Sequence, residues 1–182
     1  MSKSIKLKDD TYIDSTGVVH NRDLLSDILE NINNHLNTID SSLETNAMTI
    51  CLSANKSIGV SSTWTYYYMQ FDTVDLRLGD KLSFEGYSVK IGAGVHHVRV
   101  SANIMFEGIN GYCVAGVRKG SNWISEGYYR QNTTAYGIVS LSPKIISVNQ
   151  GDLINMGFGA SATGTMVVAG GPYTYLQVEV ID

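Results

Sequence analysis

In the stretch HVRVSANIMF, residues His97–Phe106, every second side chain is apolar, and the side chains between them are polar except for Met105. Side chains that alternate in this way lie on opposite faces of a β-strand, so one face is buried and the other is polar. The pattern therefore predicts a half-buried antiparallel strand. Its apolar face would consist of Val98, Val100, Ala102, Ile104 and Phe106.

Two later segments carry the same signal. Asp152–Phe158 alternates after a turn at Gln150-Gly151, and Tyr173–Ile181 is expected to be the closing strand. Glycines interrupt the region between Gly79 and Gly120 at roughly strand-length intervals, and no helix-length periodic pattern follows residue 46. Short strands with frequent turns are typical of a sandwich or a barrel. The sequence predicts an all-β head domain over residues 47–182.

The first quarter of the chain has a different composition. Residues 1–46 contain four Lys+Arg and eight Asp+Glu but one glycine, whereas the remainder is neutral and glycine-rich. This shift predicts a boundary near Thr45–Asn46. The 136 residues that follow are enough to bury a core of their own.

A heptad pattern precedes the boundary. Apolar residues separated by four, three, four, three and four positions form a narrow seam, as in a coiled coil. Leucine at one core position and isoleucine at the other favours three or four strands over a parallel dimer. The prediction is a trimeric stalk over residues 22–45, and the alternative is a helix packed on its own domain. The seam residues are Leu25, Leu29, Ile32, Leu36, Ile39 and Leu43.

The order of motifs in the head resembles that of the tumour necrosis factor and complement globular-head superfamily. An FD-x-V segment at Phe71–Val74 precedes the His97–Phe106 strand, a K-x-G-like turn follows at Lys119-Gly120, and a GD turn precedes the last strands. The resemblance covers roughly residues 64–181 and implies an antiparallel jelly-roll β-sandwich that assembles as a homotrimer. A trimeric head and a three-stranded stalk would stabilise each other.

The first residues predict a small hairpin, here residues 1–21, that leads into the helix. The segment also resembles the N-terminus of minor tail or baseplate-associated proteins in phages and prophages of Gram-positive bacteria. That resemblance implies a virion protein that docks on other virion proteins through this hairpin. The matching residues are Tyr12, Asp14, Ser15, Gly17, Val19, His20 and Asn21.

Two aromatic segments are candidate ligand-binding sites. Trp64, Tyr66 and Tyr68 would share one face of a strand, where they could stack on sugar rings of a cell-wall glycan. Packing in the core or at a subunit interface is the favoured alternative for them. The segment Asn122–Asn132 has the composition of a binding loop, and an ordinary connection between strands is the alternative. Its candidate ligand-binding residues are Trp123, Tyr128, Tyr129 and Arg130.

Composition argues against several other functions. The formal net charge of -4 and the sequence pI of about 5.5 leave no basic footprint for nucleic acid. No apolar run is long enough to insert into a membrane, and no secretion signal is expected. Cys51 and Cys113 are expected to be buried free thiols, which fits synthesis in the bacterial cytoplasm.

No metal or cofactor is predicted. The neighbours His96 and His97 would point to opposite faces of a strand, so they could not share a metal ion. Asp72 and Asp75 are candidate calcium ligands, but the residues around them do not resemble a known calcium-binding loop. Turn residues satisfied by local hydrogen bonds are the favoured interpretation. No nucleophile elbow, P-loop or HExxH motif is present in the sequence.

These observations favour a non-enzymatic, homotrimeric virion protein whose head binds a host cell-surface ligand, in particular a carbohydrate. The main alternative is a purely structural protein of the baseplate, tail or head decoration. A depolymerase of the cell wall or capsule and a secreted trimer of the cytokine or complement type are less favoured.

Overall fold

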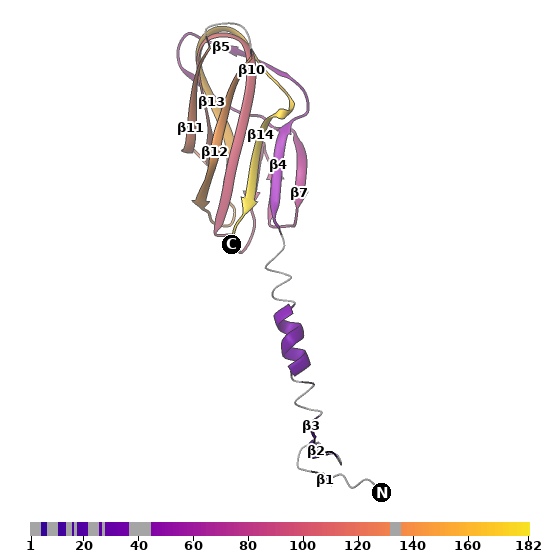
Figure 1. The fold of residues 1–182 in the computed structure, drawn as a ribbon. Coiled ribbons are helices and arrows are strands. Elements are labelled where there is room, and N and C mark those ends of the chain that lie inside the picture. Colours follow the sequence, from indigo (N-terminus) through magenta and orange to yellow (C-terminus); the bar gives the residue numbers. More distant parts are fainter. Residues whose placement is uncertain are drawn as a thin grey trace. The chain divides into compact units, whose positions relative to one another are not determined.

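The computed structural model describes residues 5–6, 11–13, 16, 18–21, 26, 28–36, 45–131 and 136–182. The chain divides into two compact units, Met1–Glu44 and Thr45–Asp182. Figure 1 labels most of their strands.

The described residues of the first unit include three short strands. β1 (Ile5–Lys6), β2 (Thr11–Ile13) and β3 (Val19–Asn21) form an antiparallel sheet in that order. The register of the second pair places Ile13 opposite Val19. Where the sequence predicted one hairpin, the structure places three paired strands.

The same unit contains a short helix at residues 26 and 28–36. Its apolar side chains are exposed, with Leu29 60%, Ile32 49% and Leu36 53% accessible. The remaining seam residues Leu25, Ile39 and Leu43 lie outside the described residues. The described helix is shorter than the predicted stalk over 22–45, and its assembly with other chains stays a prediction.

The second unit is a sheet of eleven antiparallel strands. The longest, β10, pairs with β12 and β14 through its first half and with β11 and β13 through its second half. It thereby joins two halves of the sheet. The β14 half has the order β7-β4-β14-β10-β12, and in the β13 half β13 also pairs with β5, β6 and β9. The strands are β4 (Ala47–Leu52), β5 (Lys56–Val60), β6 (Thr65–Tyr68), β7 (Thr73–Leu78), β8 (Leu82–Glu85), β9 (Ser88–Ile91), β10 (His97–Lys119), β11 (Asn122–Gln131), β12 (Gly137–Ser147), β13 (Leu153–Val168) and β14 (Gly171–Val180).

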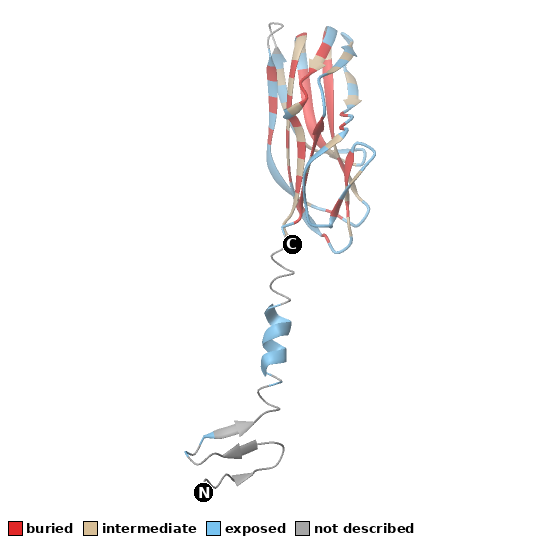
Figure 2. Ribbon diagram, turned by 90° about the vertical axis from the view of Figure 1, so that its right-hand side faces the viewer, coloured by how far each residue is buried: buried red, intermediate tan, exposed pale blue. Residues whose placement is uncertain are grey.

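The core draws side chains from both halves of the sheet. All five apolar residues of the His97–Phe106 stretch are buried, with Val98, Ile104 and Phe106 fully inaccessible, which confirms the predicted alternation. Met48 and Ile50 on β4 and Phe158 on β13 belong to the same cluster. In Figure 2 the buried positions alternate with accessible ones along the long strands. The strong alternation leaves the outer faces of the sheet free to carry polar and aromatic side chains.

One glycine marks the point where β10 changes partners. Gly108 has a φ of +86°, and a Cβ atom there would lie 2.5 Å from the carbonyl oxygen of Thr165. Only glycine fits both requirements. The expectation that such glycines end short strands is wrong here, since β10 has 23 residues and β13 has 16.

Candidate functional site

A row of aromatic side chains crosses the outer face of the β13 half. Trp64 and Tyr66 stack with ring centroids 6.3 Å apart, and Tyr66 lies 6.0 Å from Trp123. The guanidinium carbon of Arg118 lies 5.2 Å from the centroid of Trp123 and 4.3 Å from that of Tyr68. These five residues, here called the aromatic platform, form a continuous surface contributed by three strands and the residue before β6.

Alternation along β6 explains why three of these rings face outward. Tyr67, between Tyr66 and Tyr68, points inward and stacks on Phe158 with a centroid distance of 5.0 Å. The rings on the other face are 43% (Trp64), 62% (Tyr66) and 54% (Tyr68) exposed. The prediction that these three share a face is confirmed. They do not pack in the core of the chain itself, because β6 turns Tyr67 rather than its neighbours toward that core. Packing of these rings at a subunit interface stays a prediction.

Glycines form the floor beneath the rings. A Cβ atom at Gly116 on β10 would lie 2.6 Å from the Trp123 ring, and one at Gly157 on β13 would lie 2.9 Å from it. At Gly159 a Cβ atom would lie 2.9 Å from the ring of Tyr66. Glycine inside a strand allows such a close approach. The rings of Trp123 and Tyr66 therefore pack closely against the backbone of the sheet, an arrangement that sequence analysis missed.

Substituting alanine for Gly116 should displace Trp123. The new methyl would also lie 2.3 Å from the carbonyl oxygen of Ser125, so we expect a loss of about 1–3 kcal/mol in the free energy of unfolding. Gly59 on β5 is the matched control, because a Cβ atom there has no neighbour within 4 Å. Urea unfolding and tryptophan fluorescence would check both variants. Equal stability of the two variants would contradict the glycine floor.

Arg118 holds the platform together. Its Nη2 atom donates a hydrogen bond to the carbonyl oxygen of Ser121 at 2.8 Å, while its Nε atom is buried without a partner in the described part of the chain. A guanidinium over aromatic rings contributes about 0.5–2 kcal/mol, depending on its exposure. This contact links Tyr68 on β6 to Trp123 on β11 through one side chain.

The segment that contains Trp123 is a strand, not the surface loop predicted from its composition. β11 pairs with β10 from Lys119↔Asn122 to Gly111↔Gln131, with a bulge between Val117 and Arg118. Regular pairing with a buried neighbour overrides the loop-like composition. The bulge changes the register next to Trp123, and such irregularities commonly re-aim a side chain.

Two further predicted residues of β11 lie on the outer face of the sheet. Tyr128 is 73% exposed, and its hydroxyl donates a 2.8 Å hydrogen bond to Glu126, which raises the pKa of Tyr128. The guanidinium of Arg130 lies over Tyr112 at 5.2 Å from the ring centroid. These residues extend the polar and aromatic surface along β11.

Tyr129 lies on the opposite face of β11. Its ring packs edge-on against Phe106 with a centroid distance of 5.9 Å. It therefore supports the core. Of the six predicted ligand-binding residues, the structure brings Trp64, Tyr66 and Trp123 together, while Tyr128 and Arg130 lie exposed farther along β11.

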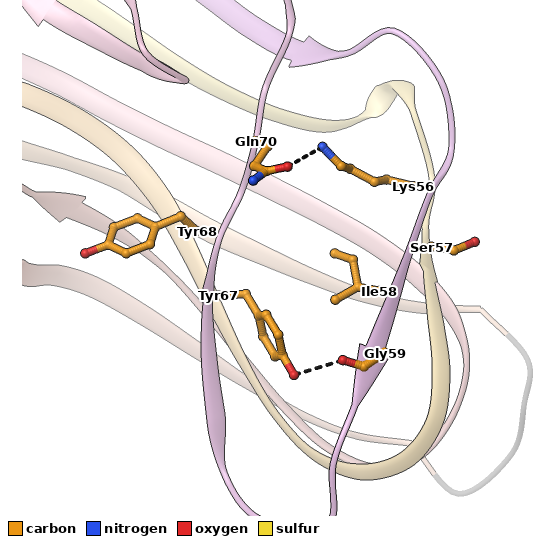
Figure 3. A pocket seen from close by; sticks show the side chains of 7 residues that line it. All are labelled: Lys56, Ser57, Ile58, Gly59, Tyr67, Tyr68 and Gln70. Carbon is orange, nitrogen blue, oxygen red and sulfur yellow. Dashed lines mark hydrogen bonds between the residues drawn. The ribbon is translucent and has the colours of Figure 1, made fainter.

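A hollow of about 390 Å³ lies between β5 and β6, two strands that both pair with β13. Figure 3 shows two hydrogen bonds among the residues that line it. Lys56 Nζ donates to Gln70 Oε1 at 2.7 Å, and the hydroxyl of Tyr67 donates to the carbonyl oxygen of Gly59 at 2.9 Å. These polar groups are satisfied within the fold, so the hollow is a weaker candidate than the platform.

Two of the candidate metal ligands, Asp72 and His97, have partners within the fold. Asp72 accepts hydrogen bonds from the backbone N–H and the hydroxyl of Ser53 at 2.6 and 3.0 Å. The hydrogen bond from the backbone N–H holds the pKa of Asp72 below its usual value. His97 Nδ1 lies 3.0 Å from Asp182 Oδ1. Within the described ranges, no three His, Cys, Asp or Glu side chains gather where they could hold a metal ion.

Both cysteines are free and buried, as predicted. Burial raises the pKa of the Cys113 thiol to about 12, so it stays protonated at neutral pH. The described part of the chain contains no helix with the length and apolar character needed to cross a bilayer.

Comparison with known proteins yields matches among solved structures alone, since no family model and no curated protein sequence matches the chain. Murine APRIL at pH 5.0 superposes with a TM-score of 0.58 and 15% identity, over 75% of this chain and 99% of that one. Eiger TNF from S. frugiperda superposes with a TM-score of 0.55 and 6% identity, over 76% and 94%.

A third similar structure is the PRD1 vertex protein P5, with a TM-score of 0.50 and 14% identity over 76% of this chain and 73% of that one. At these identities the likeness concerns the fold. The head is a mostly β, antiparallel domain with the jelly-roll fold of tumour necrosis factor-like proteins.

Proposed function

We propose that the chain is a phage or prophage virion protein whose head binds a host cell-surface glycan without catalysing a reaction. The aromatic platform carries this proposal. It offers three exposed rings and the half-buried Trp123 ring, packed against glycines of the sheet. Sugar rings present apolar C–H faces that stack on aromatic rings. The likeness of the head to a phage vertex protein supports a place on a virion.

The proposed assembly is a homotrimer. In the β14 half, exposed apolar side chains remain on the outer strands, with Leu78 42%, Ile138 51% and Ile145 57% accessible. The helix adds the exposed residues Leu29, Ile32 and Leu36, at the spacing of a coiled-coil seam. Contacts between copies would cover both apolar sets, and residues 1–21 at the start of the first unit would dock on other virion proteins.

Trimerisation would turn weak sites into a strong contact. A single shallow platform is expected to bind one glycan segment weakly, because much of the ligand stays in water. A trimer presents three platforms to a repetitive cell surface. Once the first platform is bound, the second and third contacts form at a high effective concentration. Adhesion by this route needs no bond to be broken.

The rival function is purely structural, with the head stabilising the baseplate, tail or capsid. The name of the PRD1 vertex protein is the observation that favours it, since it describes a component of the particle. In that case the platform would contact another virion protein.

The test uses the full-length chain. Native mass spectrometry should give about three times the chain mass of 19.9 kDa. The labelled trimer should then bind a panel of bacterial cells and their purified envelope polysaccharides, and periodate oxidation of the glycan should abolish binding. A monomer would refute the proposed assembly. A trimer that binds no cells or polysaccharide but enters virions would establish the structural alternative.

A further inference from the structure

A second hollow, of about 370 Å³, adjoins the aromatic platform. Tyr68 belongs to both, so the hollow is continuous with the platform at its Tyr68 end. Its size is at the lower end of the range for small-molecule sites, ~300–1,000 Å³. The lining includes Tyr68, Met69, Gln70, Tyr87, Leu153 and Asn155.

Tyr87 occupies an unfavourable backbone conformation beside this hollow. It lies in the two-residue turn between β8 and β9, where Glu85 pairs with Ser88. Its φ is +70°, the one positive φ of a non-glycine residue in the described part of the chain. Turns of this kind favour glycine and asparagine, and a bulky side chain there is costly. The ring is nevertheless 48% exposed, so packing in the fold does not explain its presence.

The floor of the hollow combines apolar side chains with one unpaired acceptor. Met69 is 1% exposed, and Leu153 lies beside it in the lining. The Oδ1 atom of Asn155 is buried and has no hydrogen-bond partner in the described part of the chain. A buried acceptor without a donor is unfavourable, and a ligand hydroxyl or N–H group would relieve that cost.

We infer that this hollow is a subsite that holds one ring of the glycan, with Tyr68 and Tyr87 as its walls. The apolar face of the sugar would contact the two tyrosines, and a hydroxyl or acetamido N–H of the same ring would donate to Asn155. Arg118 over Tyr68 fixes one wall, while the turn conformation of Tyr87 places the other. The inference rests on the proposed glycan-binding function and identifies where a single sugar residue would be recognised.

The test uses saturation-transfer NMR on the full-length protein. The probes are glucose, galactose, rhamnose, N-acetylglucosamine and N-acetylgalactosamine, each at millimolar concentration. At least one sugar should receive saturation from the wild-type protein. Tyr87→Asn should weaken that binding at least tenfold, because asparagine keeps the turn but lacks the ring. The same variant should melt at an unchanged or higher temperature, since asparagine tolerates the left-handed conformation.

Two further variants separate the hollow from the platform. Asn155→Leu should also weaken monosaccharide binding at least tenfold, whereas Tyr66→Ala should leave it within twofold and reduce polysaccharide binding. Tyr136→Ala, on an exposed residue outside both features, should change neither.

The inference is overturned if no monosaccharide receives saturation, or if Tyr87→Asn and Asn155→Leu bind as well as the wild type. Either result leaves the proposed function intact when the wild-type trimer still binds polysaccharide and Tyr66→Ala does not. Loss of all glycan binding by the wild type would refute both.

Discussion

Replacing Tyr66 and Trp123 together by alanine should reduce the affinity of each platform for host envelope polysaccharide at least about 30-fold. A central aromatic anchor contributes about 2 kcal/mol or more, and 1.4 kcal/mol corresponds to a factor of ten in affinity. Both rings lie near the middle of the platform, where Trp123 contacts Arg118 as well as Tyr66. The measurement is surface plasmon resonance with the polysaccharide in solution over immobilised protein.

The expected loss should be larger on whole cells, where all three sites act together. Tyr136→Ala is the control, because it removes a ring of similar exposure outside the platform. The double variant should remain a trimer by native mass spectrometry. Its melting temperature should stay within a few degrees of that of the wild type. Undiminished adsorption by a folded, trimeric double variant would contradict the platform as the adhesion site.

Phe158→Ala should lower the free energy of unfolding by about 3–5 kcal/mol. Phe158 is fully buried on β13, where Tyr67 stacks on it directly beneath the platform. Removing the ring leaves a cavity between the two halves of the sheet and takes away the partner of Tyr67. Because the strand carries Gly157 and Gly159 on its other face, the floor of the platform should loosen as well.

Urea unfolding at one fixed protein concentration would measure this effect, since the stability of an oligomer depends on concentration. Phe158→Leu is the conservative control and should cost less than about 1.5 kcal/mol. Tyr128→Ala, at a 73% exposed position, should change stability by less than about 0.5 kcal/mol. A small effect of Phe158→Ala would mean that the two halves do not share one cooperative core.

The buried faces of several strands could be predicted from local sequence patterns. Alternation in His97–Phe106 correctly identified which side chains are buried, because the two-residue period of a strand is a local property. The same period correctly separated Tyr66 and Tyr68 from Tyr67. Composition was less reliable in Asn122–Asn132, where polar and aromatic residues typical of loops belong largely to the paired strand β11.

The candidate site depended on information that no local pattern contains. The sequence named Trp64, Tyr66 and Trp123 as separate candidates and did not identify Arg118, Tyr87 or Asn155. A signal for the floor was present, since Gly116, Gly157 and Gly159 lie in strand-like segments, and glycine there indicates close approach. What approaches the glycine cannot be known without the neighbouring strand.

The sequence by itself determined that the head is built of antiparallel strands, that an acidic segment precedes it, and which side chains share a face in the strands with clear alternation. Only the tertiary structure decided which of the two faces is buried on β6, and which strands are neighbours. β6 pairs with β13 and β11 pairs with β10, so Tyr66 and Trp123 come within 6.0 Å although they are far apart in the chain. The physical reason is that strand order is set by packing both halves of the sheet on one core, a property of the whole domain.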